Sequence, residues 1–325
     1  MAEKKLDKKI IILDLIISIA IIVLLLKFIG VKDFLSEVWN INLYYLFLGI
    51  FFLLLMYIGM IWRIKIMLDE QKVKYNLFDV VKAHWVGMLW ADFTPARMGY
   101  FSSVAVLHKK NIPSEKAMLA VFGPQMFDFI LKFIVGTISI FYIVTYVLKV
   151  DKIEYFFLGS LVIGAMVLAM LLLLFSKRFL LLFAFSKKFP FFGTIYEMFE
   201  RMQENSHAVI KKTPHILALM LYTWTMKAIS WMFIAKSVGI VLNLPFPELL
   251  FFMFFQPTIT MLEFVPSPTL AGLGLSEGAS LIVLGLFGVP PPKATAFALI
   301  ARFKTTLVNL PAIPESIKMI NSYLK

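Results

Sequence analysis

Six stretches of the chain are apolar over the length that an α-helix needs to cross a lipid bilayer, which is about 20 residues. They lie at about 10–31, 43–62, 117–148, 154–175, 215–238 and 292–313. Hydrophobic residues make up 60% of the 325 residues and charged residues only 16%, so a water-soluble fold could not bury this apolar surface. The sequence therefore predicts an all-α integral membrane protein with about six full transmembrane helices.

Two further hydrophobic stretches, at 78–107 and 247–289, are interrupted by proline and glycine and carry charged residues. The first contains Phe93-Thr94-Pro95-Ala96-Arg97-Met98-Gly99, and the second contains Pro266-Ser267-Pro268 followed by Gly272, Gly274 and Glu277. Irregular backbone is tolerated at membrane depth only where it packs inside protein or lines a water-filled cavity. We therefore expect both stretches to form re-entrant helical hairpins.

The helices that follow the two hairpins begin alike. One begins Ile112-Pro113-Ser114-Glu115-Lys116-Ala117, and the other begins Val289-Pro290-Pro291-Pro292-Lys293-Ala294. Paired interrupted segments in two halves of a chain are typical of transporters that are built from repeats around a site near the membrane midplane. The sequence thus predicts a single polytopic domain, residues 1–325, with one repeat at about 43–148 and a second at about 215–313.

Basic residues set the orientation, because lysine and arginine are enriched in loops on the cytoplasmic side. Most of them fall on one side of the predicted spans: Lys4, Lys5, Lys8 and Lys9; Arg63, Lys65, Lys72 and Lys74; Lys109, Lys110 and Lys116; Lys177, Arg178, Lys187, Lys188, Arg201, Lys211 and Lys212; and Lys318 and Lys325. Only Lys32, Lys149 and Lys152 fall on the other. Both termini are then cytoplasmic, and the two repeats have inverted topology.

The connector at about 176–213 is polar enough to leave the bilayer, and its apolar residues recur at roughly helical spacing. It is either an amphipathic helix on the cytoplasmic surface, in contact with anionic lipid, or a plain link between the repeats. The net charge of +12 lies mainly in such short segments beside apolar spans. A membrane surface therefore explains this charge better than nucleic acid does.

Ionisable side chains inside a membrane are expensive and need a partner or a wet cavity. The candidates for substrate binding are Asp92, Arg97, Asp128, Lys132, Glu263, Glu277, Arg302 and Lys304. Arg97 and Arg302 suit a phosphate, because a guanidinium can bind two of its oxygens at once. Asp128 and Lys132 are four residues apart and can form an ion pair along one helix face. Glu277 either stabilises a helix N-terminus or binds a proton or a cation.

Signatures of several enzyme classes are absent from the sequence. There is no cysteine, no phosphate-binding loop of the Gly-x-x-x-x-Gly-Lys-Ser/Thr type, and no His-Glu-x-x-His. The histidines do not have the spacing of metal ligands; they are His84, His108, His207 and His215. We expect neither a metal nor a cofactor.

Taken together, these motifs resemble the lysylphosphatidylglycerol synthase transmembrane family, also called the flippase-like domain family. The resemblance runs from about residue 10 to 320, and it rests on Trp90 to Gly99, Phe127-Asp128, Pro266 to Glu277, and Arg302. In the multiple peptide resistance factor, the resemblance implies, such a domain moves a lipid across the bilayer and precedes a soluble aminoacyl-transferase domain. This chain ends at Lys325, so we expect a stand-alone member without aminoacylation activity. Tyr100 stands where the family leads us to expect an acidic or polar residue, which bears on the head group preferred.

The resemblance and the residues together predict a multi-pass flippase or scramblase of the cell membrane rather than an enzyme. The lipid that it moves through a midplane polar cavity is a phospholipid, an aminoacyl-phospholipid or a polyprenyl-phosphate carrier. One alternative is a membrane enzyme on a lipid-linked substrate with Asp92 or Glu277 as base. Another is a scaffold for a separate synthase or glycosyltransferase, docked through Lys187, Lys188, Lys211 and Lys212. A homo-oligomer is compatible with this composition.

Overall fold

The computed structural model describes residues 31–148, 161, 164–165, 168–169, 171–173, 175–188, 190–204, 206–261 and 273–323. The regular elements within these residues are helices: α2 (Val31–Trp39), α3 (Leu43–Glu70), α4 (Leu77–Asp92), η1 (Pro95–Phe101), α5 (Ser102–Lys109), α6 (Ser114–Tyr142), η2 (Ile143–Val147), α8 (Lys177–Leu181), η3 (Ala184–Lys188), α9 (Pro190–Glu204), α10 (Ser206–Ser237), α11 (Glu248–Met261), α12 (Leu275–Leu286), α13 (Pro291–Asn309), η6 (Leu310–Ala312) and α14 (Ile313–Tyr323). A helix bonds its own backbone groups, which is what lipid requires.

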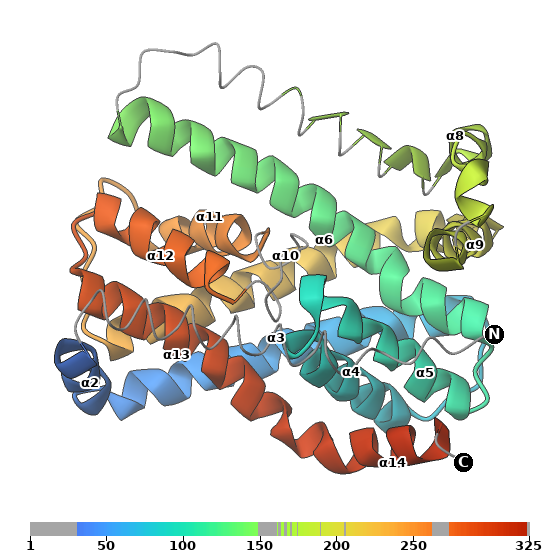
Figure 1. Cartoon of the computed structure of the whole chain (residues 1–325), viewed down its shortest axis with the longest axis horizontal. Coiled ribbons are helices and arrows are strands. Elements are labelled where there is room, and N and C mark those ends of the chain that lie inside the picture. The colour runs from blue at the N-terminus through green and yellow to red at the C-terminus, as the bar shows by residue number, and fades with distance from the viewer. Residues whose placement is uncertain are drawn as a thin grey trace. The chain divides into compact units, whose positions relative to one another are not determined.

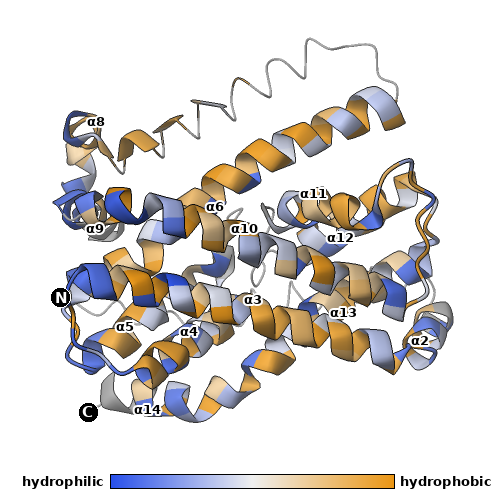
Figure 2. Ribbon diagram, turned by 180° about the vertical axis from the view of Figure 1, so that it is seen from behind, coloured by the Kyte–Doolittle hydropathy of each residue, from blue (hydrophilic) through white to orange (hydrophobic). Residues whose placement is uncertain are grey.

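Four helical segments are long and apolar enough to cross a membrane: Leu43–Glu70, Ser114–Val147, His207–Ser237 and Pro291–Met319. They coincide with four of the predicted spans. The predicted span at 10–31 lies outside the described residues apart from its last residue, as do most of 154–175 and residues 262–272 of the second broken stretch. At most 44% of the most apolar part of any of these segments is buried within the protein, so a bilayer must cover the rest. Figure 2 shows apolar residues along much of α3 and α6, whereas hydrophilic residues are prominent on α9.

The chain forms two compact units, whose boundaries fall within α3, α4, η1 and α10. The first unit contains residues 1–54, 86–100 and 226–325. The second contains residues 55–85 and 101–225. Their boundaries differ from those of the two predicted repeats, because each unit takes segments from both halves of the chain.

The core of the first unit is an aromatic cluster between α10, α11 and α13. The Trp231 ring lies 5.7 Å from that of Phe255 and 5.5 Å from that of Phe297, in both cases edge to face. Phe252 and Phe297 are fully buried. In the same unit α12 packs on both α11 and α13, as Figure 1 shows. This packing fixes the position of α13 within the unit.

Close helix approaches hold α3 and α10 together in each unit. In the first unit, a Cβ added to Gly49 would lie 2.6 Å from Ile234 Cδ1, and Ser230 Oγ donates to the Gly49 carbonyl at 2.6 Å. In the second unit, a Cβ on Gly59 would lie 2.6 Å from Thr223 Cγ2. Small residues allow membrane helices to pack at such short distances.

The two halves of the chain share a series of matching turns. Lys72 after α3 and Gly239 after α10 both have positive φ, 52° and 67°. The next amide in each case donates to the carbonyl five residues earlier, Val73 to Leu68 and Ile240 to Ala235, both at 3.0 Å. This is the Schellman arrangement that ends a helix with a left-handed residue.

The same turn recurs after α5 and after α12. Asn111 and Gly288 have φ values of 61° and 81°, and Ile112 and Val289 donate to carbonyls five residues back at 3.3 and 3.1 Å. Pro113 and Pro290 then cap α6 and α13 in nearly the same conformation, with φ of −53° and −59° and ψ of 134° and 141°. The two similar helix starts found in the sequence therefore have the same backbone geometry.

A third matching pair lies ahead of the second α-helix in each broken stretch, within η1 before α5 and directly before α12. Arg97 and Gly274 have φ values of 55° and 93°. The spacing from Arg97 to Asn111 equals that from Gly274 to Gly288. With this pair, every positive φ in the described part of the chain has a counterpart in the other half. The described backbone thus carries the same sequence of turns twice.

Candidate functional site

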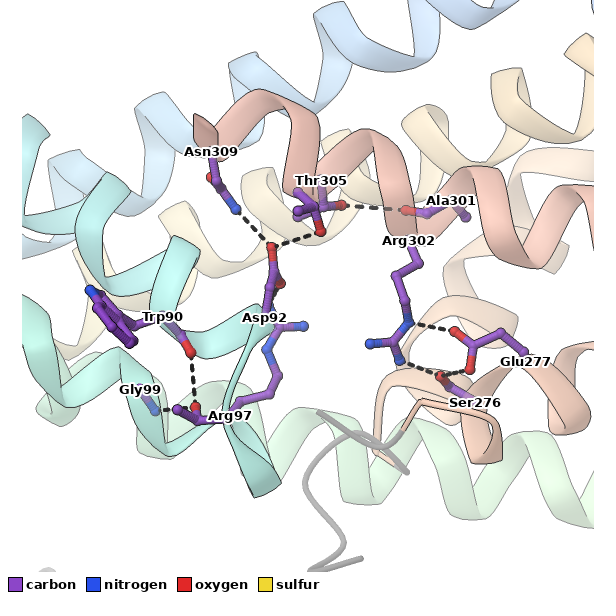
Figure 3. A network of polar contacts seen from close by, with 12 residues as sticks. Trp90, Asp92, Arg97, Gly99, Ser276, Glu277, Ala301, Arg302, Thr305 and Asn309 are labelled. Carbon is purple, nitrogen blue, oxygen red and sulfur yellow. Dashed lines mark hydrogen bonds and ion pairs between the residues drawn. The ribbon is translucent and has the colours of Figure 1, made fainter. Parts of the chain in front are cut away.

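The break after α4 is a tight turn built around Thr94. Its Oγ1 donates to the Trp90 carbonyl at 2.9 Å and accepts the Gly99 amide at 2.6 Å. A Cβ on Gly99 would lie 2.2 Å from the Trp90 carbonyl oxygen, so no larger residue fits without a backbone shift. The turn places Arg97 so that its side chain returns toward the end of α4 (Figure 3).

Asp92 is the last residue of α4, where the helix dipole disfavours a negative charge. Three donors offset this cost. Oδ1 accepts from Arg97 Nη2 at 3.3 Å, and Oδ2 accepts from Asn309 Nδ2 at 3.1 Å and Thr306 Oγ1 at 3.3 Å. Asp92 therefore links the first broken stretch to α13.

The second broken stretch presents Glu277 at the start of α12. Its Oε1 accepts from Arg302 Nε at 2.5 Å, and its Oε2 accepts from the Gly274 amide at 2.6 Å and Ser276 Oγ at 3.1 Å. Arg302 Nη2 also donates to Ser276 Oγ at 2.8 Å. The side chains of Glu277 and Arg302 are only 4% and 13% exposed. The second stretch is thus linked to α13 by a buried ion pair.

Both links use one face of α13. Arg302, Thr306 and Asn309 are spaced four and three residues apart, so their side chains line up along one side of the helix. Figure 3 shows Asp92 reaching this face near its end and Glu277 reaching it at Arg302. Two carboxylate–arginine pairs, one from each broken stretch, are therefore joined to the same helix face about one to two helical turns apart.

Lys304 points to a different side of α13, against α10. It is 4% exposed, and its Nζ donates to Ser230 Oγ at 2.5 Å. Among the residues that the structure describes, Lys304 has no acidic partner. It lies in the same compact unit as Asp92, Arg97, Glu277 and Arg302.

The second unit contains Asp128 and Lys132. Asp128 Oδ2 forms an ion pair with Arg63 Nη1 at 2.7 Å, and the Lys132 ammonium lies 5.9 Å from the centre of the Phe129 ring. The predicted span ended at residue 62 and left Arg63 in the following loop, and this boundary was wrong. α3 continues to Glu70, and Arg63 lies within it, 3% exposed. A buried arginine close to an aspartate is the arrangement that compensates both charges.

Two further residues that the sequence predicted, and two that it did not, remain to be placed. Glu263 lies outside the described residues. Lys304 is placed as a buried donor to a hydroxyl. Thr306 and Asn309 were not predicted, although their helical spacing from Arg302 was a usable signal.

Outside the spans, Tyr75 has the clearest titration effect. Burial and then its hydrogen bond to Asp69 at 2.6 Å raise the pKa of the Tyr75 phenol well above its ordinary value.

Among the described residues no three His, Asp or Glu side chains are grouped as metal ligands would be. The site on α13 can bind an anion, because guanidinium, hydroxyl and amide donors there all bind one carboxylate.

Comparison with known proteins identifies the group to which the chain is related. A comparison with curated proteins finds no match. The sequence model described as "Lysylphosphatidylglycerol synthase TM region" matches residues 11–312, which include both broken stretches and all four apolar spans up to residue 312. The chain therefore belongs to the family of lysylphosphatidylglycerol synthase transmembrane regions.

Proposed function

We propose that this chain is a lipid flippase or scramblase of the cell membrane, which moves an anionic or lipid-linked head group between leaflets without chemical change. Membership of a family of membrane regions linked to lipid synthesis supports a role with lipids. The observation that carries the proposal is the pair of carboxylate–arginine contacts on one face of α13. Such charged groups are expensive in a membrane and are usually retained for transport or binding.

In this proposal the head-group phosphate binds to Arg302 and Arg97. Arg302 is suited to this, because its donors already hold a carboxylate and a hydroxyl in a fixed plane. Asp92 and Glu277 keep the arginines compensated when no lipid is bound.

The proposed mechanism also needs the finer topology. We propose that both broken stretches are re-entrant, that the repeats are inverted and that both termini are cytoplasmic. The matching turns at Lys72 and Gly239, and at Asn111 and Gly288, support a duplicated unit. Alternating access would then follow from one repeat moving against the other around the site.

The connector bears on the expected contact with anionic lipid. Lys187 is paired with Glu200 at 3.3 Å, and Glu70 accepts from Lys211 at 2.6 Å and lies 3.3 Å from Lys212. These lysines are therefore partly neutralised within the protein, which weakens the alternative in which they dock a separate enzyme. Surface attraction to anionic lipid remains an expectation for the other basic residues of this segment.

The test is transbilayer movement of fluorescent anionic, cationic and polyprenyl-phosphate lipids in liposomes that contain the purified protein. Arg302→Ala and Arg97→Ala should each abolish movement of the transported class. Arg201→Ala is the matched control, because Arg201 also pairs with a carboxylate but is 55% exposed on α9. Equal movement by the wild type and both site variants would reject the assignment of the site.

A further inference from the structure

Glu277 is held by the kind of donors that bind a lipid phosphate. A guanidinium donates to one of its oxygens, while a main-chain amide and a hydroxyl donate to the other. The amide belongs to Gly274, at the start of α12, where positive φ turns the backbone. Amides at a helix start, together with an arginine, are a common receptor for phosphate oxygens.

We propose that the Glu277 carboxylate is a tethered substitute for the head-group anion, occupying the receptor of Arg302, Ser276 and the Gly274 amide until the lipid displaces it. This inference rests on the proposed function, since it names what competes with the lipid at the same site. It assigns Glu277 a role in setting affinity, in addition to compensating charge.

The substitution of one anion for another explains how a charged site can empty inside a membrane. An arginine left without an anion inside a membrane is expensive. When the lipid leaves, Glu277 returns to Arg302, so the empty carrier never contains an uncompensated guanidinium. The lipid in turn gains only the difference between its own contacts and those of Glu277, which keeps its affinity low enough for release.

The first broken stretch has a different arrangement, which restricts the inference to Glu277. Asp92 accepts from Thr306 and Asn309 of α13 as well as from Arg97. It therefore remains bonded when Arg97 binds another anion, and it need not leave a receptor. Among the described residues, the donors to Glu277 are Arg302, Ser276 and the Gly274 amide, which are the groups assigned to the phosphate.

The experiment measures binding of dihexanoyl phosphatidylglycerol and of geranyl phosphate to the full-length chain in a non-ionic detergent, by titration calorimetry. Glu277→Gln keeps the shape of the side chain and removes its charge. Charge-assisted hydrogen bonds are about twice as strong as neutral ones, so the variant should bind its preferred probe about tenfold more tightly. Its transport in liposomes should be slower, because no anion remains to displace the lipid.

Two further variants keep the outcome interpretable. Glu277→Asp withdraws the carboxylate by one methylene and should give an affinity between the two. Glu248→Gln is the matched control, because Glu248 also begins a helix and pairs with a lysine, Lys236, at 3.2 Å; it should bind as the wild type does. Wild-type binding combined with unchanged or weaker binding by both Glu277 variants would overturn the competition. Binding by none of the proteins, with no lipid moved, would reject the proposed function itself.

Discussion

Asn309→Asp is the most direct test of the contact that joins the first broken stretch to α13. The substitution preserves the shape of a side chain that is fully buried. It replaces the amide donor, which lies 3.1 Å from Asp92 Oδ2, by a carboxylate oxygen. A hydrogen bond is thus exchanged for a repulsion between like charges at the same place.

The size of the effect follows from that distance. Two unit charges at 3.1 Å repel by about 5 kcal/mol at an effective dielectric constant of about 20. Loss of the hydrogen bond to a charged acceptor adds about 1.5–3 kcal/mol. Uptake of a proton by one carboxyl relieves part of the repulsion, so we expect a net destabilisation of about 3–5 kcal/mol.

Thermal unfolding of the purified protein in detergent measures this change, with Asn309→Ala as comparison. The alanine variant loses only the hydrogen bond and some packing, and we expect it to be destabilised by about 2–3 kcal/mol. The order wild type, alanine, aspartate is the prediction. An aspartate variant as stable as the wild type would show that residue 309 does not face Asp92.

Three other predictions follow from single contacts. Gly99→Ala should destabilise the protein by about 1–3 kcal/mol, because the added Cβ would meet the Trp90 carbonyl oxygen. Gly285→Ala has open space around the added Cβ and should be neutral or slightly stabilising. Thermal unfolding distinguishes the two variants. Asp128→Asn should cost about 3–5 kcal/mol by leaving Arg63 buried without its carboxylate, and adding Arg63→Met should recover most of this loss in a double-mutant cycle. Tyr75 should titrate above the ordinary tyrosine pKa of about 10, so the stability that its protonated form contributes is present below about pH 10 and is lost as pH rises further. Ultraviolet titration of the wild type against Tyr75→Phe checks this, and titration of Tyr75 at the ordinary pKa would contradict it.

Much of this architecture could be predicted from the sequence, because the bilayer imposes simple rules on it. Apolar length alone located four helical segments that the structure describes. The repeated Pro-x-x-Lys-Ala starts identified two turns of the same geometry. Charge inside apolar stretches led to Asp92, Arg97, Glu277 and Arg302, which the structure brings to one face of α13.

The partners of these residues could not be predicted in the same way. Arg63 and Asp128 are far apart in the chain, and their ion pair depends on how α3 packs on α6. Ser230 of α10 accepts from Lys304 of α13 and donates to the Gly49 carbonyl of α3, so its contacts depend on how three helices pack. Thr306 and Asn309 carry no charge and would have been found only by following the helical spacing from Arg302.

The difference between the two halves at their matching turns leads to a final prediction. Arg97 lies within η1 and Gly274 directly precedes α12, both with positive φ, but one supplies a guanidinium and the other an amide. A non-glycine residue in this conformation costs about 1–2 kcal/mol, so the first half accepts strain in order to place a cation at the turn. Arg97→Gly should therefore be more stable than Arg97→Ala by about 1 kcal/mol, although both lose the contact with Asp92.

Both Arg97 variants should lose lipid movement equally, because the glycine variant retains the turn and removes only the cation. Thermal unfolding combined with the liposome assay separates the two effects. If Arg97→Gly moved lipid while Arg97→Ala did not, the requirement would be for the backbone turn and not for the charge. The side chain of Arg97 would then have no part in head-group binding, and Arg302 would be the cation that the site depends on.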